Sequence, residues 1–183
     1  MADALEIIRA SDADGFLPGP LGLRLDEEFL PLTALNAKPE VLDSLLPFGQ
    51  MRQYGAAFLL RLWPGTIWSS GPLPAGSYRT ADIGHGLTRF RLRGVEALHF
   101  LDHYTCADLF APRIRQARCV RSRLGGYDVT LWWHNTRDVH AVVFRSAAQS
   151  FADHLRALAL RHDPADPSTY PRPVTPGAPD RRG

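Results

Sequence analysis

The segment 87–93 is the part of the sequence that most constrains the fold. It reads LTRFRLR, so that Thr88, Phe90 and Leu92 alternate with three arginines. Successive side chains of a strand point to opposite faces of a sheet. The alternation therefore predicts a strand with one face buried in a core and the other face lined by arginine.

The rest of the chain predicts an α+β domain, a mainly antiparallel sheet with helices packed on one face. Prolines and glycines separate the expected elements, and residues 105–118 read as a loop around Pro112. We expect further strands at 57–63, 66–70, 119–124, 128–134 and 138–144. We expect helices at 38–46, 95–101 and 147–162, the last with Ser146 as its cap.

Three regions follow from this punctuation. Residues 1–56 predict an arm with one short helix, because closely spaced prolines and glycines between 18 and 31 oppose regular structure. Residues 57–163 form the expected α+β domain. Residues 164–183 are rich in proline and poor in apolar groups, so burial cannot offset their ordering entropy and we expect a disordered tail.

Composition excludes several classes of protein. The chain has 45% hydrophobic and 22% charged residues and a net charge of +2, which is ordinary for a globular domain and argues against a dedicated nucleic-acid binder. Cys106 and Cys119 are too few for a disulfide framework. The acidic N-terminus lacks signal-peptide character and no apolar stretch is long enough to cross a membrane. We expect a cytoplasmic protein with no membrane partner.

A set of residues in fixed order carries a resemblance to a known family. The set begins in the turn ADIGHG at 81–86, continues through the arginine strand and ends in the last helix. Its members are Asp82, His85, Gly86, Arg91, Leu92, Gly94, Ala97, Leu101, Cys106, Asp108, Leu109, Arg121, Ser122, Arg145, Ser146, Ser150 and Leu155. This pattern, over about residues 57–160, resembles the gamma subunit of heterotetrameric sarcosine oxidase. It is also similar to the N-terminal part of glycine-cleavage T-proteins. Gly84 departs from it, since the relatives usually have Ser or Thr there.

The resemblance implies a function and an assembly. Such a complex oxidises an N-methylated amino acid such as sarcosine, with FAD, FMN, NAD and tetrahydrofolate on its larger subunits and zinc on the smallest. The gamma subunit packs against the larger flavoprotein subunits, binds no cofactor and is not catalytic. The resemblance also implies the T-protein N-terminal fold, and this sequence lacks the further T-protein domains that complete a folate site.

Two groups of side chains suggest chemistry by their spacing. Asp82 and His85 could form an acid–base pair, but a short Asp turn is the favoured interpretation. His99 and His103 are four residues apart on an expected helix, but a zinc site needs about four ligands and no complete motif is present. We therefore predict no catalytic, cofactor-binding or metal-binding residue in this chain.

A partner interface is the site that the residues favour. We assign to it Arg89, Arg91, Arg93, Trp132 and Trp133. The planar guanidinium of arginine pairs well with carboxylates at interfaces, although a solvated strand face is the simpler interpretation. Adjacent tryptophans on one strand must face opposite sides, so one of them contacts either a second layer or a partner. Two alternative functions stay open: a tetrahydrofolate-dependent aminomethyl or methyl transferase fragment, and an arginine-rich nucleic-acid-binding domain.

Overall fold

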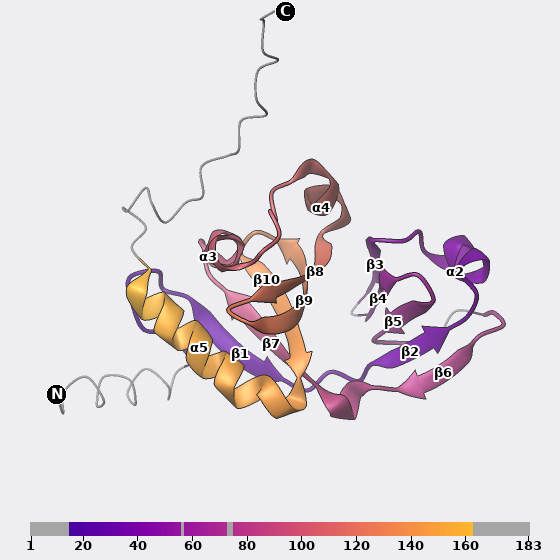
Figure 1. Ribbon diagram of the computed structural model, residues 1–183, viewed down its shortest axis with the longest axis horizontal. Coiled ribbons are helices and arrows are strands. Elements are labelled where there is room, and N and C mark those ends of the chain that lie inside the picture. The colour runs from indigo at the N-terminus through magenta and orange to yellow at the C-terminus, as the bar shows by residue number, and fades with distance from the viewer. Residues whose placement is uncertain (1–14, 56, 73–74, 163–183) are drawn as a thin grey trace, which may run out of the picture.

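The structure is a computed structural model that describes residues 15–55, 57–72 and 75–162. These residues form an α+β fold with two five-stranded sheets, in which every recorded strand pair is antiparallel. The sheets lie beside each other and are joined where β1 leads into β2 and β6 leads into β7 (Figure 1). The α+β class predicted from the sequence is confirmed, and the second sheet is an addition to it. The predicted tail and residues 1–14 of the predicted arm lie outside the described residues.

The first sheet contains the arginine strand. Its strands, in spatial order, are β1 (Arg24–Glu28), β7 (Leu87–Arg93), β10 (Asp138–Phe144), β9 (Tyr127–Asn135) and β8 (Cys119–Leu124). In β7, Thr88, Phe90 and Leu92 are buried and the arginines are partly exposed, as the alternation predicts. The hairpin of β9 and β10 is also confirmed, with a bulge at the Asp138–Val139 step.

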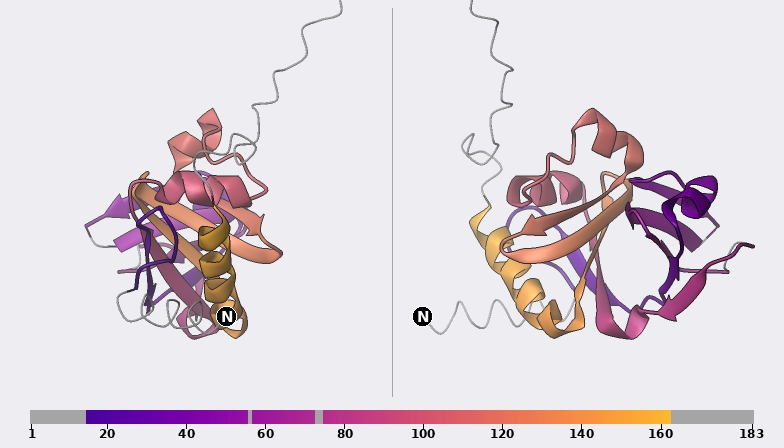
Figure 2. Two further views of the ribbon diagram at one scale, coloured as in Figure 1. Left: turned by 90° about the vertical axis from the view of Figure 1, so that its left-hand side faces the viewer. Right: turned by 45° about the vertical axis from the view of Figure 1, so that its right-hand side comes forward.

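Helices α3 (Ala97–Tyr104) and α5 (Ala148–Arg161) cover one face of this sheet (Figures 1 and 2). The main core lies between them and the sheet, and Phe90 of β7 packs against Phe151 of α5 with ring centroids 5.5 Å apart. Gly94 makes the turn from β7 to α3 at a φ of 148°. A Cβ there would lie 2.7 Å from Leu23 Cδ2, so the position requires glycine.

The second sheet has a smaller core of its own. Its strands, in spatial order, are β3 (Gln50–Tyr54), β4 (Ala57–Trp63), β5 (Thr66–Ser69), β2 (Thr33–Asn36) and β6 (Arg79–Asp82). Leu42 and Leu46, in and just after α2 (Pro39–Leu45), pack on Leu35 and Ile67 of the sheet. The strand–turn–strand of β4 and β5 and the helix near 38–46 confirm the predictions for these segments.

A third cluster of apolar side chains lies between the two sheets. Trp132 of β9 packs against Phe58 of β4 with ring centroids 4.8 Å apart, and Leu60 and Val142 belong to the same cluster. Its neighbour Trp133 points the other way, into the core under the helices. Trp132 and Trp133 are 1% and 3% exposed. The prediction that Trp132 and Trp133 lie in a partner interface is therefore corrected, because both are buried within the chain. The second sheet covers Trp132, which is the second layer that the sequence allowed as an alternative to a partner.

Two further predictions about local structure are wrong. Residues 15–55, expected to be an irregular arm with one helix, contribute β1 to the first sheet and β2 and β3 to the second, because pairing with distant strands outweighs the local breakers. The expected loop 105–118 contains a short helix, α4 (Pro112–Ala117), since proline is favourable in a first helical turn. Arg118, with a φ of 55°, ends it.

The helix starts also differ from the expected ones. A 3-10 turn, η2 (Arg145–Ala147), precedes α5. The N-cap residue of α5 is therefore Ala147, where the sequence predicted Ser146. Val95 precedes α3 and is 60% exposed, so it is no part of the buried stripe. Another 3-10 turn, η1 (Gly84–Gly86), leads from β6 into β7.

Candidate functional site

The three arginines of β7, here called the β7 arginine row (Arg89, Arg91 and Arg93), face the side of the first sheet opposite to α3 and α5. Carboxylates of the neighbouring strands pair with them. Arg91 donates through Nε and Nη2 to the two carboxylate oxygens of Asp138 at 2.8 and 2.7 Å. Arg89 pairs with Glu28, and Arg93 pairs with Asp26. The strand register causes this, because β1 lies beside β7 with Asp26 opposite Arg91 and Glu28 opposite Arg89.

These pairs change the protonation properties of the groups involved. The hydrogen bond to Asp138 raises the pKa of Arg91, and the same contact with Arg91 lowers the pKa of Asp138. Burial raises the pKa of Asp26, but hydrogen bonds from Arg93 and Arg24 outweigh burial and the net shift is downward. The row is therefore charged and largely neutralised within the chain. Its role in a partner interface stays a prediction.

A cavity of about 340 Å³ opens beside the row. Arg89, Arg91, Trp132, His134 and His140 line it, together with residues of the second sheet. The imidazole of His140 is stacked on the Trp132 indole with centroids 5.1 Å apart.

Burial, and after it the charge of Arg89, lowers the pKa of His140 to about 3. Burial also lowers the pKa of His134. Both histidines are thus neutral at physiological pH. The closest approach between His140 Nε2 and Asp138 Oδ1 is 3.9 Å, too long for a hydrogen bond. The cavity therefore contains neutral imidazoles beside arginines that are already paired with carboxylates. These groups stabilise the fold, and their arrangement does not favour acid–base catalysis.

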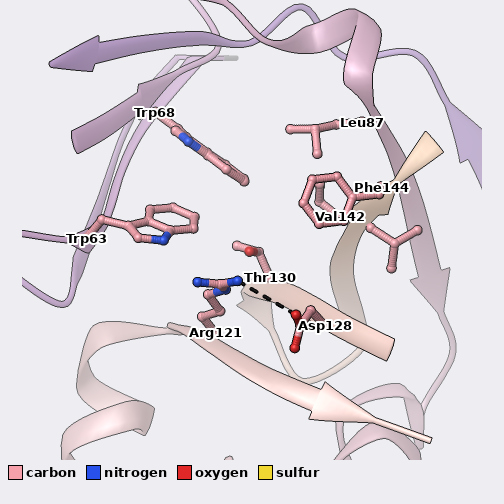
Figure 3. Close-up of a pocket in the computed structure, with 9 residues that line it drawn as sticks. Trp63, Trp68, Leu87, Arg121, Asp128, Thr130, Val142 and Phe144 are labelled. Carbon is pink, nitrogen blue, oxygen red and sulfur yellow. Dashed lines mark ion pairs between the residues drawn. The ribbon is translucent and has the colours of Figure 1, made fainter. Parts of the chain in front are cut away.

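A second hollow of about 60 Å³ lies at the other side of the space between the sheets (Figure 3). Trp63 and Trp68 of the second sheet point into it, and their rings are 4.5 Å apart. From the first sheet come Arg121, whose guanidinium lies 5.5 Å from the Trp63 ring, and Phe144, which is 60% exposed. The ion pair between Arg121 and Asp128 is loose, with Nη2 and Oδ2 3.9 Å apart. This hollow offers aromatic surface and a weakly paired cation.

The Asp82–His85 turn has the structural form that the sequence favours. Asp82 Oδ1 accepts a hydrogen bond from the Gly84 N–H at 2.9 Å. His85 Nε2 is 3.8 Å from Asp82 Oδ2, and its side chain is 83% exposed. A Cβ on Gly84 would lie 3.1 Å from backbone atoms of Leu30 and Leu32, so the backbone is tightly packed at this position.

His99 and His103 do not share one environment on α3. His99 stacks on Phe110 and lies 3.3 Å from the Glu96 carboxylate, while His103 packs edge-on against Tyr104 and His162. Across the part of the chain that the structure describes, no group of three or more His, Cys, Asp or Glu side chains could hold a metal ion. Cys119 is buried, which raises the pKa of its thiol to about 12, and Cys106 is exposed.

Asp138 and His140 are residues that the sequence interpretation missed. They alternate with apolar residues in the segment DVHAVVF, and a polar residue inside a buried strand is a signal that it has a polar neighbour. Arg61 was also missed, although it gives the same signal. It lies in the apolar run of β4, is 1% exposed and donates to Asp43 and to the carbonyls of Leu46, Pro39 and Pro64.

Comparison with solved structures gives a clear similarity. The fold is similar to that of a chain in the heterotetrameric sarcosine oxidase from Corynebacterium sp. U-96, solved in complex with pyrrole 2-carboxylate. The TM-score is 0.66 at 16% sequence identity, and the match covers 84% of this chain and 91% of that chain. At this identity the match establishes a shared fold. No protein-family model matches the sequence, and no curated protein does. Within the described segments, every helix is too short or too polar to span a bilayer.

Proposed function

We propose that this chain is a non-catalytic accessory subunit, equivalent to the gamma subunit, of a complex like heterotetrameric sarcosine oxidase. The observation that carries the proposal is the fold match, which extends over most of both chains. Coverage of this kind implies that the two chains are similar in length. Because the matched chain is part of a heterotetramer, a role of this chain in a similar assembly is the simplest explanation of the shared fold.

The sequence pattern supports the same assignment from independent residues. Several of its members have structural roles that explain their presence. Asp82 accepts a hydrogen bond in the turn that leads into β7, and Gly94 has a backbone conformation that requires glycine. Arg91 forms the bidentate pair with Asp138. These residues build a scaffold. The complex would oxidise an N-methylated amino acid, with FAD, FMN, NAD, tetrahydrofolate and zinc on the partner subunits.

Purification of the tagged chain from its native source tests the proposal. We expect larger subunits to co-purify in stoichiometric amounts, with the absorbance of bound flavin and with sarcosine-dependent oxidase activity in the eluate. The chain alone should lack this activity. Recovery of the chain as a monomer, without flavoprotein subunits, would contradict the proposal.

A calorimetric titration separates this function from the transferase alternative. The isolated chain should release no heat with tetrahydrofolate, because the cofactor would bind to another subunit. Saturable binding of tetrahydrofolate by the chain alone would favour a folate-dependent enzyme.

A further inference from the structure

A second group of arginines lies on α4 and β8, at the edge of the first sheet. The five α4–β8 arginines are all exposed, and residues 109–127 contain no Asp or Glu. The group consists of Arg113, Arg115, Arg118, Arg121 and Arg123. Among the residues that the structure describes, Asp128 is the one carboxylate that pairs with any of them, at 3.9 Å from both Arg121 and Arg123. The surface therefore carries an unbalanced positive charge.

This charge borders a groove with apolar walls. A hollow of about 320 Å³ lies between α4 and β8 on one side and the β3–β4 region on the other, and both Arg113 and Arg121 line it. Its apolar walls include Leu62, Ile114 and Phe48, which is 48% exposed. A neighbouring hollow of about 280 Å³ shares Phe48 and Arg113 and extends along β3. We call the two together the α4–β8 groove. Figure 1 shows α4 above β8, on the side toward β3.

Two edge strands flank the groove. β8 is the last strand of the first sheet, and β3 is the last strand of the second. Arginines on an edge strand discourage uncontrolled pairing, which would explain Arg121 and Arg123 by themselves. Arg113 and Arg115 lie on a helix, however, where that explanation does not apply. Their charge needs a different reason.

From these observations we infer that the α4–β8 groove docks an acidic segment of a partner polypeptide. The inference deepens the proposed function and rests on it, since it names the surface by which the subunit would bind a larger one. Arginine and exposed aromatic side chains are enriched in protein interfaces, and complementary charge selects the partner and accelerates association. The combination of apolar walls with guanidinium groups fits a peptide that carries carboxylates beside an apolar side chain.

Charge reversal within the assembled complex tests the inference. The groove variant is R113E/R115E/R123E, and the matched control is R79E/R137E/R161E, which reverses three exposed arginines on β6, in the β9–β10 turn and at the end of α5. Each is exchanged for the wild-type chain in the native source, and the affinity for the larger subunits is measured. Urea unfolding of both variants establishes that they are folded.

We expect the groove variant to lose affinity by at least tenfold, while the control binds as the wild type does. Wild-type binding should also weaken as salt is raised from 0.05 to about 0.5 M, because salt screens exposed charges. Assembly of the groove variant with wild-type affinity would overturn the docking inference while leaving the accessory-subunit proposal intact.

Failure of the wild-type chain to bind any larger subunit would instead contradict the proposed function. The groove is then tested with poly-L-glutamate as the probe. If the wild type binds poly-L-glutamate and the groove variant does not, the result supports an acidic polypeptide as the occupant of the groove. Equal binding by both proteins, or stronger binding of a single-stranded RNA oligonucleotide than of poly-L-glutamate, overturns it.

Discussion

The β7 arginine row and the α4–β8 arginines use the same residue type in opposite ways. Each arginine of the row has a carboxylate from β1 or β10 beside it, and the row lies in a partly closed space between the sheets. Among the described residues, the α4–β8 arginines have one carboxylate nearby, Asp128, which lies 3.9 Å from Arg121 and Arg123, and all five face solvent. The contrast teaches that a basic strand is not by itself a docking surface. What distinguishes the two regions is whether the chain supplies its own counter-charges.

The largest effect should come from Arg61, which is 1% exposed and is the most buried arginine among the described residues. Its replacement in R61M leaves four oxygen acceptors without their donor. We expect the free energy of unfolding to fall by about 3 kcal/mol. Urea denaturation measures this. R52M is the control, since Arg52 is exposed on the adjacent strand, and a loss of similar size in R52M would break the distinction.

The pH dependence of stability should report the closed environment beside the β7 arginine row. The unfolded chain protonates His140 near its ordinary pKa of 6.5, whereas the folded chain resists protonation down to about 3. The unfolded state therefore binds more protons in this window, and stability falls as the pH is lowered from 6.5 toward 3. We expect a loss of roughly 2 to 3 kcal/mol between pH 7 and 4 that H140N reduces.

The control for this measurement is H85N, because the His85 side chain is 83% exposed. It should leave the slope of stability against pH unchanged. The lowered pKa of Asp138 acts mainly at more acidic pH, since its stabilising effect is present above 3.8 and is lost as the pH falls through the folded value. A slope that is the same in H140N and wild type would contradict the lowered pKa of His140 in the folded chain.

The same chemical change at one carboxylate of each region tests the comparison directly. D138N removes the charge that pairs with the half-buried Arg91, and we expect a loss of about 1.5 kcal/mol in the free energy of unfolding. D128N removes the charge beside Arg121 and Arg123, where the contact is longer and both sides are exposed, and the change should stay within about 0.5 kcal/mol. Thermal or urea unfolding compares the two. Equal effects would erase the distinction between the regions.

The smallest effect on stability should come from neutralising the α4–β8 arginines. R113Q/R115Q removes two charges without ion partners among the described residues, so the free energy of unfolding should change by less than about 0.5 kcal/mol. A gain in stability is also consistent, since like charges are removed. A loss above 1 kcal/mol, measured by urea denaturation, would mean that these arginines serve the fold.

How much could be predicted differs between strands that bury one face in a core and strands that are held mainly by pairing with a distant strand. The strand at 87–93, the β9–β10 hairpin and the last helix follow from periodicity, because one face of each is packed in a core. β1, β2 and β6 have weak local signals: RLDEE in β1 is mostly charged and becomes a strand by pairing with β7. Such strands depend on partners far along the chain, which local pattern does not reveal.

The candidate site shows the same division. The sequence identified the arginines of β7 and the opposed directions of Trp132 and Trp133. It did not identify the partners, because Asp26, Glu28 and Asp138 come from positions 47 to 67 residues away. It also treated residues 105–118 as a loop, and so missed the helix that carries Arg113 and Arg115 to the border of a groove.

The sequence by itself determined which side chains alternate, where the strongest strands and helices lie, and that arginine is the cation at both surfaces. The tertiary structure decided which arginines are neutralised, which tryptophan is covered by a second sheet, and which charged surface stays open. The physical reason is that periodicity is a local property of the chain, whereas charge pairing and burial depend on the strands that long-range register brings side by side.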